Sequence, residues 1–383
     1  MPLPRHLFQG LFFFVSFSLA LFFAFPGAWA KNTTLKSGMS GKALYQNACA
    51  ACHGGDGTGA PQTQLGFDVP PPDFTDCQFA PREADGDWMI VVMEGGPARE
   101  FSELMPAFGD ALTEAQVKRI LDHIRTFCTD KSWPRGELNL PRPLVTTKAF
   151  PEDELVVSST LNTAGLNSFA SKIIYEQRIG ARNQVELIVP LEWAEQEKAD
   201  DPGDTQWQSS VGDIGIAGKR VLYASLDTGA IVSVGGELFF PTGEEEEGFG
   251  AGTAVFEPYV AYGQILPADC FFHLQGGFGL PFDTDEKNEE AFWRGTFGYT
   301  FTTGRYGRAW SPMIGLLGAR EMVSEASTHY DLTPQFQVSL NRRQNVRLGA
   351  GARIPLNDTD IRETEYMFYV LWDWFDGSFF VGW

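Results

Sequence analysis

The sequence predicts a multidomain chain in which a small all-α module is followed by an antiparallel β-barrel of about 12 strands. Three observations predict this fold class. The spacing of apolar residues changes along the 383-residue chain from the helical period to the alternation of strands. The 41 Gly, 32 Phe, 10 Trp and 10 Tyr favour strands and turns in the larger part. The connections between alternating segments also fall into a short set and a long set.

Composition and charge exclude two classes of protein. The chain has 49 acidic and 29 basic side chains, a formal net charge of −20. Nucleic-acid binding needs clustered Lys and Arg, so no nucleic-acid partner is expected. A chain that is 43% hydrophobic is also too apolar to be disordered.

The first element, residues 1–30, has the pattern of a secretory signal peptide. Arg5 and His6 precede an apolar run over residues 11–25, and the Ala-Trp-Ala of residues 28–30 forms a cleavage site. The alternative is a membrane anchor, but this run is shorter than the ~20 residues of a spanning helix. Export places the cysteines of the chain in an oxidising compartment.

The second element, residues 37–130, is a helical module that carries CAACH at residues 49–53. This spacing lets the thiols of Cys49 and Cys52 bond to the two vinyl groups of one haem c, while His53 becomes the proximal iron ligand. A thioredoxin-like dithiol would need a βαβ context and a zinc site would need a second ligand pair. The sequence shows neither, so covalent haem attachment is the prediction.

A terminal helix of this module follows MPAFG at residues 105–109. Its start, TEAQ at residues 113–116, is a capping box, and apolar residues at 117, 120, 121, 124 and 127 share one helical face. Met89 and Met93 lie in an apolar run and are predicted to be core. His123 lies opposite the apolar face and is predicted to be exposed to solvent.

The module resembles the class I cytochrome c family and is similar to the mono-haem subunit of cbb3-type oxidases. The resemblance is carried by CAACHGGDGTG, by PPPDFTD at residues 70–76 and by MPAFG. It implies that Met105 is the distal iron ligand. His/Met ligation implies a raised potential suited to electron transfer rather than oxygen chemistry.

Two further cysteines of the module, Cys77 and Cys128, lie outside the haem motif. In an exported chain they are expected to form a disulfide, and the alternative is two buried free thiols.

The third element, residues 131–153, contains Pro134, Pro141, Pro143 and Pro151 among charged and small residues. This composition predicts a semi-rigid extended linker.

The fourth element, residues 154–383, is predicted to be an outer-membrane β-barrel. Apolar and polar residues alternate along its segments, as in residues 183–193. The predicted strands are 154–164, 171–180, 183–195, 206–225, 228–240, 252–266, 270–281, 290–303, 308–322, 328–341, 345–356 and 364–383.

The connections and the C-terminus favour a barrel that spans a membrane. Short turns alternate with longer acidic loops at 195–205, 241–251 and 283–290, as in bacterial outer-membrane barrels. The ending FFVGW at residues 379–383 resembles the insertion signal of porin-like barrels. A soluble sandwich would also alternate, but it needs a second sheet to cover its apolar face.

Several charged and sulfur side chains of the barrel have two interpretations. The four Glu of residues 244–247 form a solvated loop or, alternatively, a cation site. Arg347 and Arg353 line a polar lumen or pair with inward carboxylates. Cys270 is assigned no role.

The combination resembles fused cytochrome and porin proteins that are proposed to pass electrons across the outer membrane. In that family the cytochrome part is shorter and the barrel larger, so its substrate is not carried over. A module of ~95 residues, with a radius of gyration near ~13 Å, is too large for the lumen of such a barrel. We therefore expect the haem module in the periplasm of a Gram-negative bacterium, below the outer membrane.

The expected function is electron transfer without enzymatic activity. Periplasmic electron carriers, an outer-membrane or extracellular redox partner and the outer-membrane lipid are the expected partners. One alternative is a porin-like channel for a small solute, with the cytochrome as redox gate or reductant. Another is an enzyme such as a peroxidase, which would need an open iron position, and Met105 argues against it.

Overall fold

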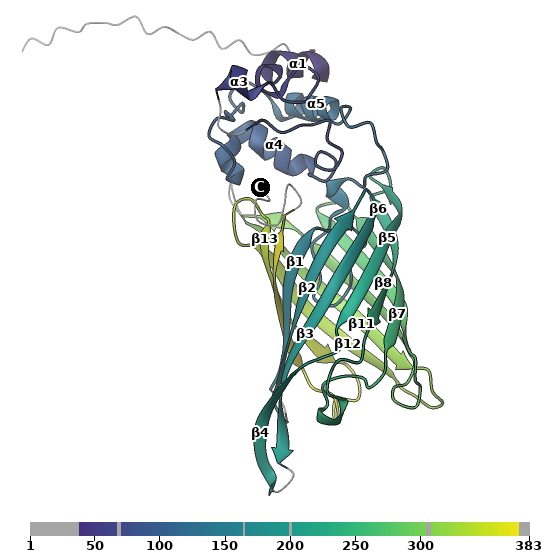
Figure 1. Cartoon of the computed structure of the whole chain (residues 1–383). Coiled ribbons are helices and arrows are strands. Elements are labelled where there is room, and N and C mark those ends of the chain that lie inside the picture. Colours follow the sequence, from purple (N-terminus) through teal and green to yellow (C-terminus); the bar gives the residue numbers. More distant parts are fainter. Residues whose placement is uncertain (1–37, 67–69, 164, 199–200, 304–307, 375–383) are drawn as a thin grey trace, which may run out of the picture. The chain divides into compact units, whose positions relative to one another are not determined.

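The computed structural model describes residues 38–66, 70–163, 165–198, 201–303 and 308–374. A helical region is followed in the chain by one large antiparallel sheet (Figure 1). The predicted signal peptide and the C-terminal FFVGW lie outside the described residues.

The helical region begins with short helices around the CAACH motif and ends with a longer one. Its elements are α1 Gly41–Ala48, α2 Ala50–His53, α3 Gln62–Leu65, α4 Asp85–Glu94, the 3-10 turn η1 Gly96–Arg99, α5 Glu114–Ile124 and the 3-10 turn η2 Gly136–Leu138. The predicted capping box of α5 is confirmed: Thr113 Oγ1 accepts from Gln116 N at 3.3 Å, and Gln116 Oε1 accepts from Thr113 N at 2.9 Å. No helix in the described part of the chain is long and apolar enough to cross a membrane.

The core of this region lies where α1, α4 and α5 pack together. Its buried side chains are Leu44, Tyr45, Phe74, Val92, Leu112, Val117, Ile120, Leu121 and Ile124. We call this set the helical core. It includes the apolar face predicted for α5 at residues 117, 120, 121 and 124, which explains why a helix of only 11 residues is stable here.

The sheet contains all twelve predicted strand segments. Its strands are β1 Glu154–Asn162, β2 Ser168–Ile179, β3 Asn183–Lys198, β4 Asp201–Val211, β5 Gly215–Ser225, β6 Ala230–Phe239, β7 Val255–Ile265, β8 Cys270–Pro281, β9 Glu290–Tyr299, β10 Phe301–Thr302, β11 Ala309–Glu321, β12 Thr328–Ser339, β13 Val346–Pro355 and β14 Glu365–Asp373. β4 and β5 both pair with β3, and β9 and β10 both pair with β11, so each pair is one interrupted barrel strand.

The sheet closes on itself into a barrel of 12 antiparallel strands. Consecutive strands are neighbours throughout, and the first strand pairs with the last in the register Glu154↔Asp373 and Val156↔Leu371. The prediction of a barrel of about 12 strands is therefore confirmed. Closure removes the unpaired edges that an open sheet would expose.

The two ends of the barrel differ in their connections. One end has the short turns that follow β2, β5, β7, β10 and β12, and β1 begins there. The other end has the longer connections, including the exposed 3-10 turn η3 Glu245–Glu247. The loop predicted at 195–205 is wrong, because β3 and β4 pair from Leu191↔Val211 to Lys198↔Asp201. The polar residues of this segment lie in strands because β3 and β4 form main-chain hydrogen bonds with each other.

The barrel is apolar outside, and its inner face combines polar side chains with three buried apolar clusters. On β11, Ile314 and Leu316 are each 50% exposed, whereas Ser311 is 1% exposed. A soluble sandwich has the reverse arrangement, with its apolar faces covered by a second sheet. The outward apolar face is what a lipid-facing barrel requires.

Residues 138–153, which we call the luminal segment, differ from the predicted linker. Lys148, Ala149, Phe150 and Glu152 are all at most 3% exposed, and their partners are inward side chains of the barrel. The segment is extended, as its prolines predict, but it is packed inside the barrel rather than spacing two bodies. Its leucines and Phe150 would be exposed to water in a free linker, so burial is favourable.

Candidate functional site

The CAACH motif lies at the junction of α1 and α2. α1 ends at Ala48 with Cys49 as its C-cap, and α2 carries Cys52 and His53. Tyr45 is fully buried in the helical core, and its hydroxyl group donates to the carbonyl oxygens of Gly54 at 2.8 Å and His53 at 3.2 Å. Burial raises the pKa of Tyr45, so this phenol stays a hydrogen-bond donor and fixes the end of the motif.

Cys49 and Cys52 are one helical turn apart and are not bonded to each other. Cys49 packs against the helical core, and burial, with a smaller effect of Cys52, raises its pKa to about 11. Both thiols are thus available for the two bonds that haem c attachment needs.

The ring of His53 is held against the helical core. It stacks on Phe74 with ring centroids 5.0 Å apart and planes at 25°. Its Nδ1 is buried and has no hydrogen-bond partner among the described residues. Burial lowers the pKa of His53 to about 4, so the imidazole is neutral and able to bind a metal.

A chain of side chains in contact extends from His53 to α5. The ring centroids of Phe74 and Trp88 are 5.3 Å apart with their planes tilted by 55°, and the guanidinium of Arg125 lies 3.9 Å from the centre of the Trp88 ring. Arg125 also donates to Asp85 Oδ1 at 2.7 Å and to the carbonyl oxygens of Ala80 and Glu83. Arg125 therefore joins α5 to the aromatic residues that support the His53 ring.

Replacing Arg125 with Met should lower the free energy of unfolding of the helical region by about 2–3 kcal/mol, since charge-assisted hydrogen bonds to buried acceptors are lost. Denaturant unfolding followed by Trp fluorescence measures this. Lys118→Met is the matched control, because the Lys118–Asp122 pair is exposed at 65% and 59% and should contribute little. Equal effects of the two substitutions would contradict the role given to Arg125.

Met105 lies on the loop between η1 and α5 and packs against the helical core. Its carbonyl oxygen accepts from Gly96 N at 2.9 Å. A Cβ at Gly96 would lie 2.2 Å from the carbonyl oxygen of Ser102 and 3.2 Å from Met105 Cβ. Because only glycine permits this close approach, Gly96 helps to fix the position of the loop that carries Met105.

Three methionines, Met89, Met93 and Met105, pack against the same helical core. The core placement predicted for Met89 and Met93 is confirmed. The exposure predicted for His123 is wrong: its ring packs edge-on against Tyr45 at 5.5 Å and Phe127 at 5.0 Å. The face of α5 that contacts α1 is wider than the run of aliphatic residues indicates.

Cys77 and Cys128 are joined in a disulfide with Cα atoms 5.2 Å apart. Of the two alternatives for this pair, the structure contains the disulfide. It ties the segment after PPPDFTD to the end of the last helix.

These residues fit a covalently bound haem. The group requires two unpaired thiols, a neutral histidine and a second donor such as a thioether sulfur, and Cys49, Cys52, His53 and Met105 offer these atoms. Cys49 and Cys52 would hold it, His53 and Met105 would bind its iron, and Phe74 and Trp88 would contribute to its apolar surroundings.

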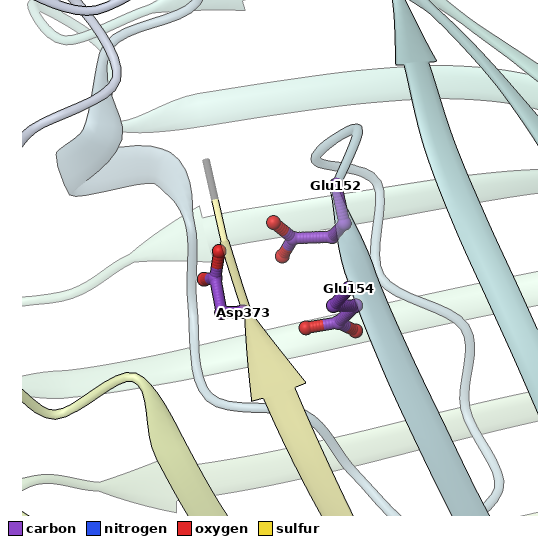
Figure 2. Close-up of side chains that lie close together, drawn as sticks. All are labelled: Glu152, Glu154 and Asp373. Carbon is purple, nitrogen blue, oxygen red and sulfur yellow. The ribbon is translucent and has the colours of Figure 1, made fainter. Parts of the chain in front are cut away.

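A second group of possible metal ligands lies in the barrel. Carboxylate oxygens of Glu152, Glu154 and Asp373 all lie within 4.8 Å of one another and are buried (Figure 2). They come from the luminal segment, β1 and β14, where the barrel closes.

Basic side chains balance this carboxylate group. Lys148 pairs with Glu152, Arg142 with Glu154 at 2.5 Å, and Arg347 with Asp373 at 4.0 Å. Each carboxylate thus has its own cation, and we interpret the group as an ion-pair network rather than a metal site.

The two interpretations of Arg347 and Arg353, that they line a polar lumen and that they pair with inward carboxylates, are both correct. They face the lumen, and Arg353 pairs with Asp331 at 2.7 Å and Glu365 at 3.6 Å. Sequence reasoning missed the inward amides that bind the luminal segment, Gln184, Gln275, Gln335 and Gln337. The alternation of polar and apolar residues along their strands indicates that these amides face inward. No neighbouring residue in the sequence indicates that they bind the luminal segment.

Comparisons with known proteins agree with a two-part chain. Residues 36–124 match the family described as cytochrome C oxidase, cbb3-type, subunit III. This match covers well under half of the chain, and it supports a cytochrome c domain that would bind haem. No curated protein matches the chain.

Solved structures similar to the chain include two porins and one outer-membrane channel. A KdgM porin is 9% identical, with 57% of this chain and 98% of that chain covered and a TM-score of 0.37. A NanC porin is also 9% identical, with the same coverage and a TM-score of 0.39. An outer-membrane channel from Pseudomonas putida F1 is 11% identical over 61% and 99% of the two chains, with a TM-score of 0.38.

Proposed function

We propose that the protein is an electron carrier in which one covalently bound haem c is anchored to the outer membrane by a β-barrel. The observation that carries this proposal is the CAACH motif with its histidine packed on Phe74 and its buried Nδ1 unbonded within the described structure. When bound, the haem iron supplies a one-electron couple.

The residues of this chain have separate roles in that function. Cys49 and Cys52 tether the haem, and His53 and Met105 bind the iron. Because His53 and Met105 would both bind the iron, they would leave no ligand position for a substrate, so we propose a carrier and not an enzyme. The apolar shell around the ligands, with Phe74 and Trp88, excludes water and favours the less charged, reduced state.

The two faces of the barrel support the proposal that it anchors the protein in the outer membrane. Its outward side chains are apolar, and its inward ones form hydrogen bonds and ion pairs. We propose that the short-turn end, where β1 begins, faces the periplasm, because outer-membrane barrels have short periplasmic turns. Periplasmic electron carriers would then reach the haem module directly.

The test begins with the full chain purified from a strain that matures c-type cytochromes. We expect haem that remains attached after denaturation, in a ratio of one per chain, and a reversible one-electron titration. Cys52→Ala should weaken attachment, whereas Cys270→Ala, a cysteine outside the motif, should leave it unchanged. Protein without attached haem would refute the proposal.

A second measurement addresses the partners. Cells that lack the protein should lose electron exchange with a membrane-impermeant donor or acceptor, and cells with His53→Ala should behave like them. Normal exchange in both strains would contradict the proposed role at the outer membrane.

A further inference from the structure

We propose that the luminal segment, residues 138–153, is a resident plug that keeps the barrel closed, and that buried ion pairs of Lys148 and Arg142 act as its latch. The barrel then conducts ions only when the latch is broken. This inference concerns the barrel and is independent of the proposed electron-transfer function.

The plug bonds to, shares a buried cluster with, or lies against residues of all twelve barrel strands, with β4/β5 and β9/β10 each counted as one strand. Its leucines and Phe150 belong to the same buried clusters as residues of the barrel strands, and its polar groups meet inward side chains. The barrel partners, in strand order, are Glu154, Glu176, Gln184, Lys219, Ser233, Tyr259, His273, Gln275, Thr296, Met313, Gln335, Gln337, Gly351 and Tyr369. A segment that contacts all strands occupies the cross-section of the lumen.

The inward side chains of the barrel strands, which we call the wall, form hydrogen bonds with individual main-chain groups of the plug. Arg142 N donates to Gln337 Oε1 at 2.9 Å, Leu144 N to Gln335 Oε1 at 2.6 Å, and Thr147 N to Gln275 Oε1 at 3.0 Å. An irregular segment loses its hydrogen bonds to water when it is buried, so it stays only where such partners exist. This complementarity indicates a resident segment rather than a chain in transit.

The latch consists of two basic side chains of the plug. Lys148 pairs with Glu152, and both side chains are at most 2% exposed. Arg142 bridges Glu154 at 2.5 Å and Glu176 at 2.7 Å, which belong to β1 and β2 of the wall. Figure 2 shows Glu152 of the plug beside Glu154 and Asp373 of the wall. Removing one cation leaves a buried carboxylate without compensation, which favours release of the plug into water.

The lumen is hollow beyond the plug. The plug is therefore the part that blocks a path through the barrel. A cavity of about 520 Å³ lies on the side of the long connections, and its lining includes Lys172, Glu192, Glu257 and Lys287. No residue of the plug lines this cavity. Charged walls of this kind favour water and ions once a path exists.

Conductance of the full haem-loaded chain in planar lipid bilayers tests the proposal. The unaltered protein should stay closed. Lys148→Met and Arg142→Met should each raise the time spent open by about 100-fold or more. Lys198→Met is the matched control, because Lys198 pairs with Asp204 at exposed positions and should leave conductance unchanged. Equal conductance of the unaltered protein and Lys148→Met would overturn the proposal.

A cross-link tests the position of the plug without weakening the fold. Thr146 Oγ1 of the plug and Thr296 Oγ1 of β9 are 3.0 Å apart and buried. In a Cys270→Ser background, Thr146→Cys with Thr296→Cys should form a disulfide in the membrane-inserted barrel, detected by mass spectrometry. Adding Lys148→Met to this cross-linked protein should give no openings until a reductant is added. A folded barrel whose two cysteines stay reduced under oxidant would refute the placement of the plug.

Discussion

Replacing Met105 with Ala should lower the reduction potential of the haem by a sizeable part of the ~0.8 V range that axial ligands span, and abolish the absorbance band typical of Met ligation. The reason is that a soft thioether favours the reduced iron, and its loss opens a position to water or hydroxide. Redox titration followed by visible absorbance measures both effects.

Two other methionines provide matched controls for this substitution. Met89 and Met93 pack against the same helical core as Met105, so their truncation removes a similar apolar volume. Met89→Ala and Met93→Ala should lower stability yet keep the absorbance band and the potential nearly unchanged. A loss of the band in Met93→Ala with an unchanged Met105→Ala would assign the ligand to Met93 instead.

Removing the disulfide with Cys77→Ser and Cys128→Ser should lower the free energy of unfolding of the helical region by ~3–4 kcal/mol. The bond closes a loop with a sequence separation of 51 residues, and its loss returns that conformational freedom to the unfolded chain. Denaturant unfolding monitored at the haem absorbance measures the change.

The effect should be specific to this pair. Cys270→Ser removes a cysteine that forms no disulfide, so it should leave the unfolding free energy within about 0.5 kcal/mol of the original. Addition of a reductant to the unaltered protein should reproduce the loss. Stability that is insensitive to both the serine pair and the reductant would contradict a structural role for the bond.

The strands of the barrel were predictable because their signal is local. An alternation such as that of residues 183–193 requires only that one face be polar and the other apolar, and a closed barrel satisfies this in every strand. The sequence did not predict the interruption between β4 and β5. It lies opposite Val189 and Pro190 of β3, between the pairs Leu191↔Val211 and Ile188↔Gly215, and Pro190 has no N–H to donate to a neighbouring strand.

The candidate site was also largely local. CAACH and the capping box of α5 involve residues within a few positions of each other, so their sequence spacing fixes their geometry. The support of His53 was not local: Phe74, Trp88 and Arg125 come from three separate segments. No spacing rule places an arginine on a tryptophan 37 positions earlier in the chain.

The luminal segment shows the limit of composition as a guide. Its three prolines and its charged residues are typical of a linker, and its main chain is extended as they predict. Leu138, Leu140, Leu144 and Phe150 are the residues that a solvated linker would not need, and they were the available signal of burial.

The sequence by itself thus determined the CAACH motif, the helix that closes the module and the alternating strands of a twelve-stranded barrel. Only the tertiary structure decided what fills that barrel. The physical reason is that periodicity and motifs report contacts between near positions, whereas Gln335 and Gln337 find Leu144 and Arg142 only after the barrel closes. Burial of these polar groups depends on partners almost 200 residues away, and no local pattern encodes them.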